Sequence, residues 1–371
     1  MPAIIHLQSA PPQAFHLPDR EGREFLPAAY QAVAPETRTT VAAIRPRNVF
    51  IEVTNHCNLL CETCPRTFNS YEEPMTLSWE NFCRIVEQFP DMERAVLHGI
   101  GEPLINKELP RMIAHLKALG VVVLFNTNAT LLNEGWSRKL IASGLDELRV
   151  SLDGADPITY ARIRGAPLLH KLVANLKRFV EIQKELCAAT PRVSLWMTGM
   201  RENIAELPDV VRLAAHMAVP EVYLQRMVYY AGEADAPGMM GGGHGVYANF
   251  DEQVDRVVAE SESLAQRLGV ALLGSGATTA RRSLKPDDQR RPWSACMRPW
   301  TTAYITANGN ALPCCISPFA TSDYESLKLG NVFDRPFDDL WNDERYQGWR
   351  EQLLSDKPHP ACAGCGVHWS L

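Results

Sequence analysis

Short apolar runs and longer amphipathic segments alternate through the middle of the chain. Between Val49 and Gln225, six apolar runs suit strands buried on both faces, and segments with helical spacing separate them. The predicted strands are residues 49–53, 95–98, 121–125, 148–152, 193–197 and 222–225. The predicted helices are residues 78–89, 109–119, 133–143, 168–186, 204–217 and 251–268.

This alternation predicts an α/β fold, because strands that alternate with helices form a parallel sheet through right-handed crossovers. Six units are too few for the closed eight-unit barrel, so we expect an open, partial (βα)6 barrel. The chemistry of such folds lies at the C-terminal ends of the strands. Further along, the Asn308-Gly309 turn predicts a hairpin that starts at Tyr304–Thr306 and returns through Leu312.

The chain divides into three segments. Residues 1–47 are rich in proline and alanine without a sustained period, and we expect an extended arm that wraps the domain or is partly disordered. Residues 48–280 form the predicted barrel, and residues 281–371 form a small second module with the hairpin and helices. Residues 231–249 are glycine-rich and break the pattern, which indicates either a surface loop or a lid over the substrate.

Composition and charge narrow the classes of binding partner and the cellular location that we expect. The net charge of −6 is spread over 371 residues, which gives no basic footprint for nucleic acid or an anionic membrane. No run of about eighteen apolar residues is present, which argues against a membrane span. Because Met1 to Phe15 lack the basic start and apolar core of a secretory signal, we expect a cytoplasmic protein.

Seven of the ten cysteines fall into two groups. Cytoplasmic thiols stay reduced, so clustered cysteines there are more often ligands or catalysts than disulfides. The first group, Cys57, Cys61 and Cys64, has C-x3-C-x2-C spacing directly after the first predicted strand. Three thiolates on one loop can hold three irons of a cubane cluster and leave the fourth iron open. Zinc usually takes four protein ligands drawn as pairs, so the spacing favours an iron–sulfur cluster.

Three polar motifs follow at the ends of the next strands. Gly99–Pro103 (Gly-Ile-Gly-Glu-Pro) follows the second strand, Thr127-Asn128 the third, and Ser151–Gly154 (Ser-Leu-Asp-Gly) the fourth. Each motif alone is a common turn sequence. Their order is informative, because all three fall at strand C-termini downstream of the cysteine loop.

On these residues the sequence resembles the radical S-adenosylmethionine superfamily from about residue 49 to residue 371. The resemblance implies that the open iron chelates the amino and carboxylate groups of the methionine moiety. One electron then cleaves the sulfonium, and the resulting 5′-deoxyadenosyl radical abstracts hydrogen from the substrate. The resemblance also implies an electron donor such as a flavodoxin or a ferredoxin.

The resemblance assigns cofactor contacts to the motif residues. Glu102 and its backbone neighbours are expected to bind the methionine ammonium, and Arg164 to pair with the carboxylate. The full set of implied S-adenosylmethionine contacts is Gly101, Glu102, Thr127, Asn128, Ser151, Asp153, Arg164 and Gln225. The chain departs from the family where Ile100 and Ala129 replace glycines and Thr63 replaces an aromatic residue, so we expect a weaker adenine contact at Thr63.

The second cysteine group contains Cys296, Cys314, Cys362 and Cys365. Four thiolates complete the ligand set of one cluster or of a structural zinc ion. The spacing resembles the C-terminal modules called SPASM and twitch, which implies an auxiliary [4Fe–4S] cluster. No cysteine follows Cys365, so we expect a one-cluster, twitch-like module or a shortened SPASM module. Cys315 is an alternative ligand, although the Gly-x4-Cys spacing favours Cys314.

These features together predict a radical oxidoreductase. A fully thiolate-ligated auxiliary cluster has no open iron, so accepting an electron from a substrate radical is its simplest use; a purely structural role is the alternative. We expect a small-molecule substrate such as a sugar, an aminocyclitol or a natural-product intermediate. Many peptide-modifying relatives carry a leader-binding domain of about eighty residues, whereas 47 residues precede the first strand here.

Other functions stay open at this point. They are peptide or protein modification by cross-linking or epimerisation, and a redox-neutral epimerase or dehydratase. An electron-transfer protein with two clusters would leave Glu102, Ser151 and Asp153 unexplained, and a zinc-bound scaffold protein is a further alternative. The substrate-side candidates, chosen because they lie at or after strand ends, are His98, Arg226, Tyr229 and Tyr230. His98 is either a general base near neutral pH or a histidine satisfied by its neighbours.

Overall fold

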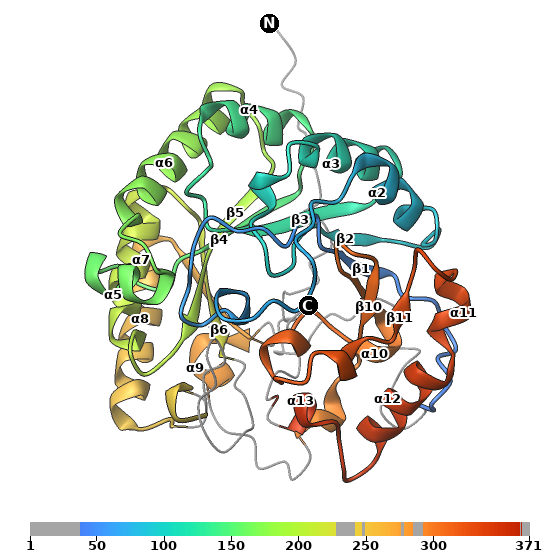
Figure 1. Cartoon of the computed structure of the whole chain (residues 1–371). Coiled ribbons are helices and arrows are strands. Elements are labelled where there is room, and N and C mark those ends of the chain that lie inside the picture. Colours follow the sequence, from blue (N-terminus) through green and yellow to red (C-terminus); the bar gives the residue numbers. More distant parts are fainter. Residues whose placement is uncertain are drawn as a thin grey trace, which may run out of the picture.

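The structure is a computed structural model that describes residues 38–227, 242–246, 249–275, 278–284, 292–363 and 365. One twisted sheet runs through the molecule (Figure 1). Its strands are β1 (Asn48–Ile51), β2 (Arg94–Val96), β3 (Val122–Thr127), β4 (Glu147–Ser151), β5 (Arg192–Gly199), β6 (Glu221–Arg226), β7 (Ala271–Gly274), β8 (Thr278–Thr279), β9 (Thr302–Ile305), β10 (Asn310–Leu312) and β11 (Gly330–Asn331). The spatial order is β11-β10-β9-β1-β2-β3-β4-β5-β6-β7-β8.

The six predicted strands are β1 to β6, and they pair in parallel in sequence order. This arrangement confirms the α/β fold and the partial barrel. The sheet extends further than predicted at both ends. β7 adds a seventh strand parallel to β6, and β9 pairs in parallel with the free edge of β1. The hairpin of β9 and β10, with β11 beside it, forms the antiparallel C-terminal part.

Helices cover the outer face of the sheet (Figure 1). The barrel helices are α2 (Trp79–Val86), α3 (Leu109–Ala118), α4 (Glu134–Ala142), α5 (Pro157–Arg164), α6 (Leu169–Glu185), α7 (Leu207–His216) and α8 (Glu252–Leu268). Those that follow are α9 (Ala280–Leu284), α10 (Arg298–Thr301), α11 (Phe337–Trp341), α12 (Glu344–Leu354) and α13 (Pro360–Ala363). The sequence analysis missed α5, a short helix in which only Tyr160 and Ile163 are buried.

Side-chain caps explain where several helices begin. Ser78, Asn133 and Asp251 each accept a hydrogen bond from a backbone N–H in the first turn of α2, α4 and α8. Asp156 accepts from the N–H groups of Ile158 and Thr159 and starts α5 immediately after the fourth-strand motif. The cap therefore fixes where Arg164, the last residue of α5, is placed.

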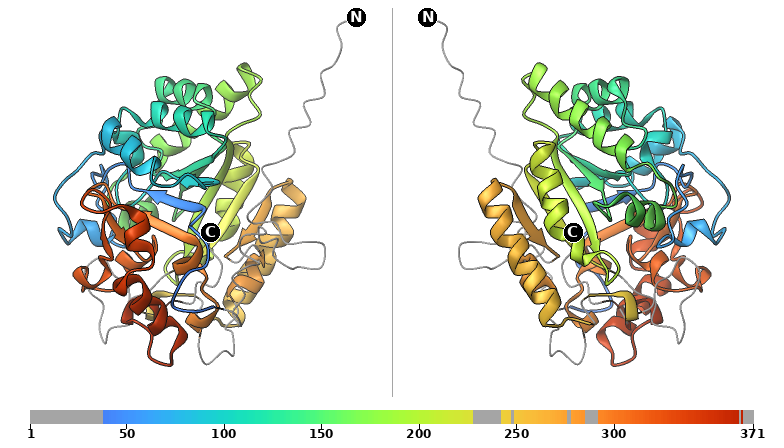
Figure 2. Two further views of the ribbon diagram at one scale, coloured as in Figure 1. Left: turned by 90° about the vertical axis from the view of Figure 1, so that its right-hand side faces the viewer. Right: turned by 90° about the vertical axis from the view of Figure 1, so that its left-hand side faces the viewer.

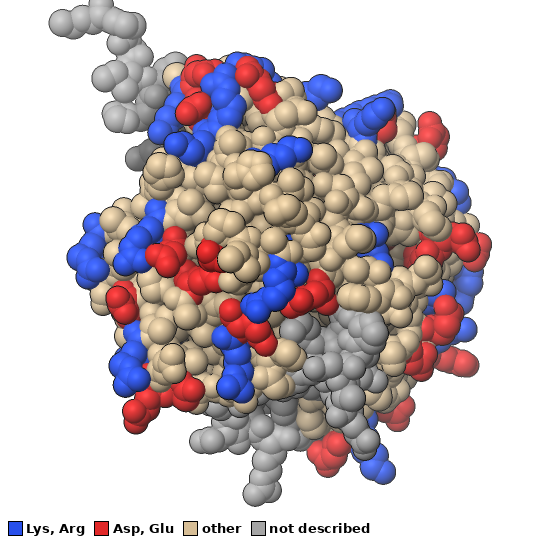
Figure 3. Space-filling model, turned by 60° about the vertical axis from the view of Figure 1, so that its left-hand side comes forward, with Lys and Arg blue, Asp and Glu red and all other residues tan. Residues whose placement is uncertain are grey.

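The outer surface is charged and mixed in sign. Arg138 and Arg178 pair with Glu134 and Glu185 between α4 and α6. On the face shown in Figure 3, basic and acidic side chains are interspersed. In the part of the chain that the structure describes, no helix is both long and apolar enough to cross a bilayer.

The C-terminal helices α11 to α13 lie on one flank of the barrel opening, and α8 and α9 lie on the other (Figure 2). Residues 38–45 run along the C-terminal helices as an extended segment. The indole N–H of Trp300 donates to the carbonyl of Thr39 at 2.8 Å, and that of Trp341 donates to the carbonyl of Ile44 at 2.8 Å.

The guanidinium of Arg350 connects this segment to three parts of the C-terminal region. It is fully buried and donates to the carbonyls of Pro299, Thr40 and Trp341 and to the side chain of Asn342 at 2.7–3.0 Å. Burial lowers the pKa of Arg350 to about 10. The guanidinium therefore remains charged at neutral pH.

Replacing Arg350 with methionine should strongly destabilise the C-terminal region. The substitution leaves four buried acceptors without their donor, which costs on the order of 3 kcal/mol or more. Anaerobic thermal unfolding should show a lower midpoint for Arg350→Met. Arg212→Met removes an exposed arginine of α7 that pairs with Asp209, and it should stay within about 0.5 kcal/mol of the parent. Equal midpoints for the two variants would contradict the role given to Arg350.

Candidate functional site

A cavity of about 290 Å³ lies at the C-terminal ends of the barrel strands. The predicted residues that line it are Cys57, Cys61, Cys64, His98, Gly101, Glu102, Thr127, Asn128, Ser151, Asp153, Arg164 and Gln225. The structure thus brings together all eight expected cofactor contacts and all three cysteines of the first group. Cys315, Ile316 and Phe319, from the loop after β10, also line the cavity.

The cysteine loop leaves the end of β1 and is held by two close backbone contacts. A Cβ atom at Gly101 would lie 2.1 Å from the carbonyl oxygen of Thr54. A Cβ atom at Gly165, which has a φ of +71°, would lie 2.1 Å from the carbonyl oxygen of Leu60. Both positions therefore require glycine. Backbone N–H groups of Glu102 and Glu62 donate to the carbonyls of His56 and Ile163 and complete the attachment.

The buried carboxylate of Glu52 holds the base of this loop. It accepts hydrogen bonds from the N–H of Ile100 at 2.8 Å, the hydroxyl of Tyr304 at 3.2 Å and the N–H of Ala307 at 3.3 Å. Burial is the main reason why the pKa of Glu52 rises to about 7. Glu52 thus joins β1 to the turn after β2 and to the C-terminal hairpin.

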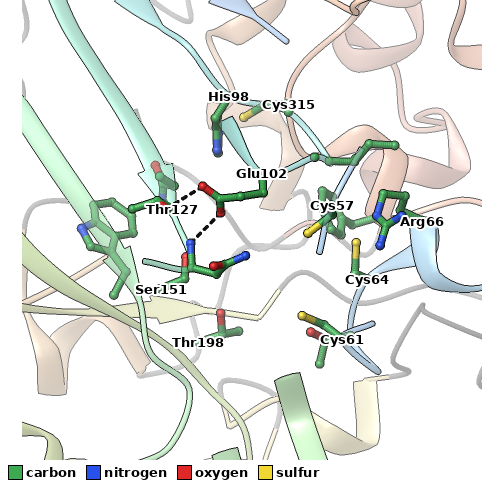
Figure 4. Close-up of a pocket in the computed structure, with 18 of the residues that line it drawn as sticks. Cys57, Cys61, Cys64, Arg66, His98, Glu102, Thr127, Ser151, Thr198 and Cys315 are labelled. Atoms are coloured by element: carbon green, nitrogen blue, oxygen red, sulfur yellow. Dashed lines mark hydrogen bonds between the residues drawn. The ribbon is translucent and has the colours of Figure 1, made fainter. Parts of the chain in front are cut away.

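The three thiols of the first group face the same cavity (Figure 4). Burial raises the pKa of the Cys57 thiol and raises that of Cys64 to about 12, while the nearby Arg66 guanidinium opposes both shifts. Iron binding requires the thiolate form, so it would displace these protons. Three thiols on one loop beside a cavity fit a cluster with one open iron.

Glu102 is fixed at the cavity wall by three donors. One carboxylate oxygen accepts from the hydroxyl of Thr127 at 2.6 Å and from the N–H of Leu104 at 3.1 Å, and the other accepts from the N–H of Asn128 at 2.8 Å. Burial raises the pKa of Glu102, and these hydrogen bonds oppose the shift. A buried acceptor with a fixed orientation suits an ammonium group. Ala129, where the family has glycine, adopts a left-handed φ of +54°.

Asp153 and Arg164 form a buried ion pair that also lines the cavity. Nη2 of Arg164 lies 2.7 Å from Oδ2 of Asp153, and Oδ1 of Asp153 accepts from the N–H of Thr198 at 2.8 Å. Nε of Arg164 is buried and has no hydrogen-bond partner among the described residues. An unsatisfied guanidinium N–H beside the cavity fits the carboxylate of an amino acid.

The substrate-side candidates are placed differently from one another. His98 lines the cavity, and burial with nearby Arg149 and Arg94 lowers the pKa of His98 to about 4. Its imidazole is therefore neutral at pH 7. Arg226 is not among the residues that line the cavity; its guanidinium donates to the carbonyl of Ser283 in α9. Tyr229 and Tyr230 lie outside the described residues, as does most of the predicted loop at 231–249.

The second group of cysteines lies in the C-terminal module. Burial raises the pKa of Cys362 well above its usual value, and Cys314, Cys296 and Cys365 raise it further. These four thiols therefore lie near one another, and the buried Arg298 interacts with Cys315, Cys314, Cys296 and Cys365. Cys315 lines the barrel cavity, next to His98 (Figure 4). It also interacts with Arg298 and Cys314, so it lies close to both the cavity and the second thiol group.

The sequence analysis missed several residues of the cavity wall, among them Arg66, Thr198, Ile316 and Phe319. Thr198 lies two residues beyond Trp196, and both face the cavity from β5, as the two-residue period of a strand requires. The predicted strand ends at residue 197. Continuing the two-residue alternation one residue further would have identified Thr198 as a residue that faces the cavity. Ile316 and Phe319 carry no local signal, because only the tertiary fold places them over the barrel.

Two family models match separate parts of the chain. A family model described as the radical SAM superfamily matches residues 51–214, and one described as a SPASM iron–sulfur cluster-binding domain matches residues 296–366. The second match favours iron–sulfur over zinc in the C-terminal module.

Relatives align over most of the chain. The tungsten-containing aldehyde ferredoxin oxidoreductase cofactor-modifying protein of Pyrococcus furiosus is 22% identical over 332 residues, covering 86% of this chain and 87% of that protein. The PqqA peptide cyclase of Xanthomonas axonopodis pv. citri is 25% identical over 337 residues, covering 86% and 80%.

The fold is also shared with a solved structure. The crystal structure of Streptococcus suis SuiB bound to S-adenosylmethionine has a TM-score of 0.64 at 18% identity, covering 91% of this chain and 77% of that chain. SuiB bound to its precursor peptide SuiA has a TM-score of 0.61 at 16% identity, covering 92% and 73%. At this identity the likeness establishes the fold.

Replacing Gly101 with alanine should empty the cysteine loop of iron while the rest of the chain stays folded. The new methyl group would overlap the carbonyl of Thr54 and push the loop away from the cavity. Two cubane clusters correspond to about eight irons per chain, and the variant should retain about four after anaerobic reconstitution. Gly348→Ala, where a Cβ atom meets nothing within 4 Å, should load iron like the parent. Full iron content in Gly101→Ala would show that the contact does not position the loop.

Proposed function

The chain belongs to the radical S-adenosylmethionine superfamily and carries a C-terminal SPASM iron–sulfur domain, and we propose that it oxidises a peptide or protein substrate. When bound, the reduced cluster and S-adenosylmethionine would supply a 5′-deoxyadenosyl radical able to remove a hydrogen atom from the substrate. The auxiliary cluster would take up the remaining electron as the substrate releases a proton to solvent, so that two hydrogens are lost in all. The proposed ligands of the first cluster are Cys57, Cys61 and Cys64, and those of the auxiliary cluster are Cys296, Cys314, Cys362 and Cys365.

The other side chains of the cavity bind and orient the cofactor. Glu102, fixed by Thr127 and Asn128, accepts the methionine ammonium, and Arg164 presents its free Nε–H to the carboxylate. Because Asp153 pairs with Arg164 and also accepts from the N–H of Thr198, the guanidinium has a fixed orientation. Glu102 and Arg164 would thus bind the two charged groups of one α-carbon, which restricts the direction in which the rest of the methionine, with its sulfonium, extends.

The observation that carries the oxidative assignment is the position of Cys314 and Cys315. Cys314 lies with the second thiol group, and Cys315, the next residue, lines the cavity. One peptide unit therefore separates the proposed auxiliary cluster ligand from the place where the substrate radical would form. A cluster that only stabilised the C-terminal module would have no need to lie against this cavity.

The relatives support a peptide substrate over the small molecule that the sequence analysis favoured. One relative is a cyclase of the PqqA peptide, and SuiB has been solved with its precursor peptide bound. The wall beyond the cofactor residues is largely apolar, with Met227, Ile316 and Phe319 among its members. Such a wall accommodates an uncharged side chain and keeps water away from a carbon radical.

The experiment incubates anaerobically reconstituted protein with dithionite, S-adenosylmethionine and a fractionated extract of the source cells. Turnover should release 5′-deoxyadenosine, and mass spectrometry should find a loss of about two mass units, the mass of two hydrogens, in the peptide fraction. The Cys57→Ala variant is the control for background chemistry. A two-unit loss confined to the small-molecule fraction, or a product of unchanged mass, would contradict oxidation of a peptide.

Removing the auxiliary ligands should separate cofactor cleavage from product formation. The double variant Cys362→Ala/Cys365→Ala keeps the first cysteine loop intact, so it should still release 5′-deoxyadenosine. Its product yield should fall by at least tenfold, because the substrate radical loses its electron acceptor. Cys187→Ala, which removes an exposed thiol, should behave like the parent. Normal product yield from the double variant would exclude the auxiliary site as the oxidant.

A further inference from the structure

Three arginines line the cavity, and two of them are neutralised by carboxylates. Arg149 donates to Glu147 from Nε at 3.1 Å and from Nη2 at 2.9 Å. Arg164 pairs with Asp153 at 2.7 Å. The third arginine, Arg66, has no carboxylate partner among the described residues and is the unneutralised cation of this wall.

Arg66 is held close to the first cysteine group by its own loop. It lies two residues after Cys64 in the 3-10 turn η1 (Pro65–Thr67). Its Nη2 donates to the carbonyl of Leu59 at 2.6 Å, so the guanidinium reaches back across the loop. Figure 4 shows the guanidinium beside the thiols of Cys57 and Cys64. Its Nε is buried without a hydrogen-bond partner among the described residues.

We propose that Arg66 raises the reduction potential of the cluster held by Cys57, Cys61 and Cys64. Reduction adds one negative charge to a group that three thiolates already make negative. A fixed cation beside two of the three sulfurs stabilises the reduced form more than the oxidised form, and the effect is strong where the surroundings are poorly hydrated. Net charge and hydrogen bonding around the sulfurs are the protein's main controls of cluster potential.

The other cations of the cavity are offset by carboxylates. Asp153 offsets Arg164, which lies beside the thiol of Cys61, and Glu147 offsets Arg149, so each pair adds less net field than Arg66. Glu102 is an acidic neighbour of Cys57 and acts in the opposite direction. Arg66 therefore compensates both for the added electron and for Glu102.

The test is a redox titration of the anaerobically reconstituted holoenzyme, followed by electron paramagnetic resonance. The first cluster is identified by the signal that changes when S-adenosylmethionine is added. Arg66→Gln should make one-electron reduction of this cluster about tenfold less favourable, a shift of about 59 mV to lower potential. Arg66→Lys retains the charge and should stay close to the parent. Arg212→Gln, which removes an exposed charge on α7, should leave the potential unchanged.

The inference rests on the proposed cluster ligands. The titration distinguishes a failure of the ligand assignment from a failure of the role given to Arg66. Iron content and the signal shift with S-adenosylmethionine report on the ligands; the midpoint reports on Arg66. An Arg66→Gln protein with full iron, a normal signal shift and an unchanged midpoint overturns the role of Arg66 alone. If Arg66→Gln loses its iron, the Arg66→Lys variant provides the test. A tenfold less favourable reduction of the cluster in Arg66→Lys, which retains the positive charge, would also overturn the proposal. A cluster that survives replacement of all three cysteines refutes the ligand set.

Discussion

The geometry of the site depends on the pairing of strand β1 with neighbours on both of its edges. The strand pairs in parallel with β2 on one side and with β9 on the other, so the barrel and the C-terminal module share one backbone ladder. The cysteine loop leaves from its end, and the carboxylate of Glu52, the next residue, binds the turn after β2 and the hairpin after β9. One buried acidic group thus sets the relative positions of the loop, the ammonium-binding turn and the auxiliary module.

Electrostatic pairing explains how so many charges fit around one cavity. Arg149 and Arg164 are each matched by a carboxylate, and Glu102 is matched by neutral donors. Matched groups keep a fixed orientation and avoid the cost of an isolated buried charge. The unmatched atoms, Nε of Arg164 and Nε of Arg66, lie where negatively charged partners are expected.

Much of the site could be predicted from the sequence, because its motifs sit at strand ends and the fold brings those ends to one edge. The alternation of the sequence predicts the six central strands, and the eight residues that the family resemblance assigned to the cofactor all line the cavity. Arg226 shows the limit of a prediction from strand ends: successive residues of a strand point to opposite sides, so Gln225 lines the cavity whereas Arg226 binds α9. The strand β7 has only four residues and little periodic signal.

The contribution of the C-terminal loop could not be predicted. Cys315 and Phe319 are more than 200 residues away from the cysteine loop in sequence, and only the pairing of β9 with β1 carries them over the barrel. Arg66 was missed for a related reason, since the local sequence does not show where its side chain points. Its contact with Leu59 depends on how the loop folds back on itself.

The shared ladder between β1 and β9 also has an architectural meaning. A lid that hinged at the start of β9 would have to break four consecutive residue pairings in the interior of the sheet. The C-terminal module is therefore joined to the barrel through the interior of one continuous sheet. Any displacement of this module as a rigid body would disrupt the strand from which the cysteine loop leaves.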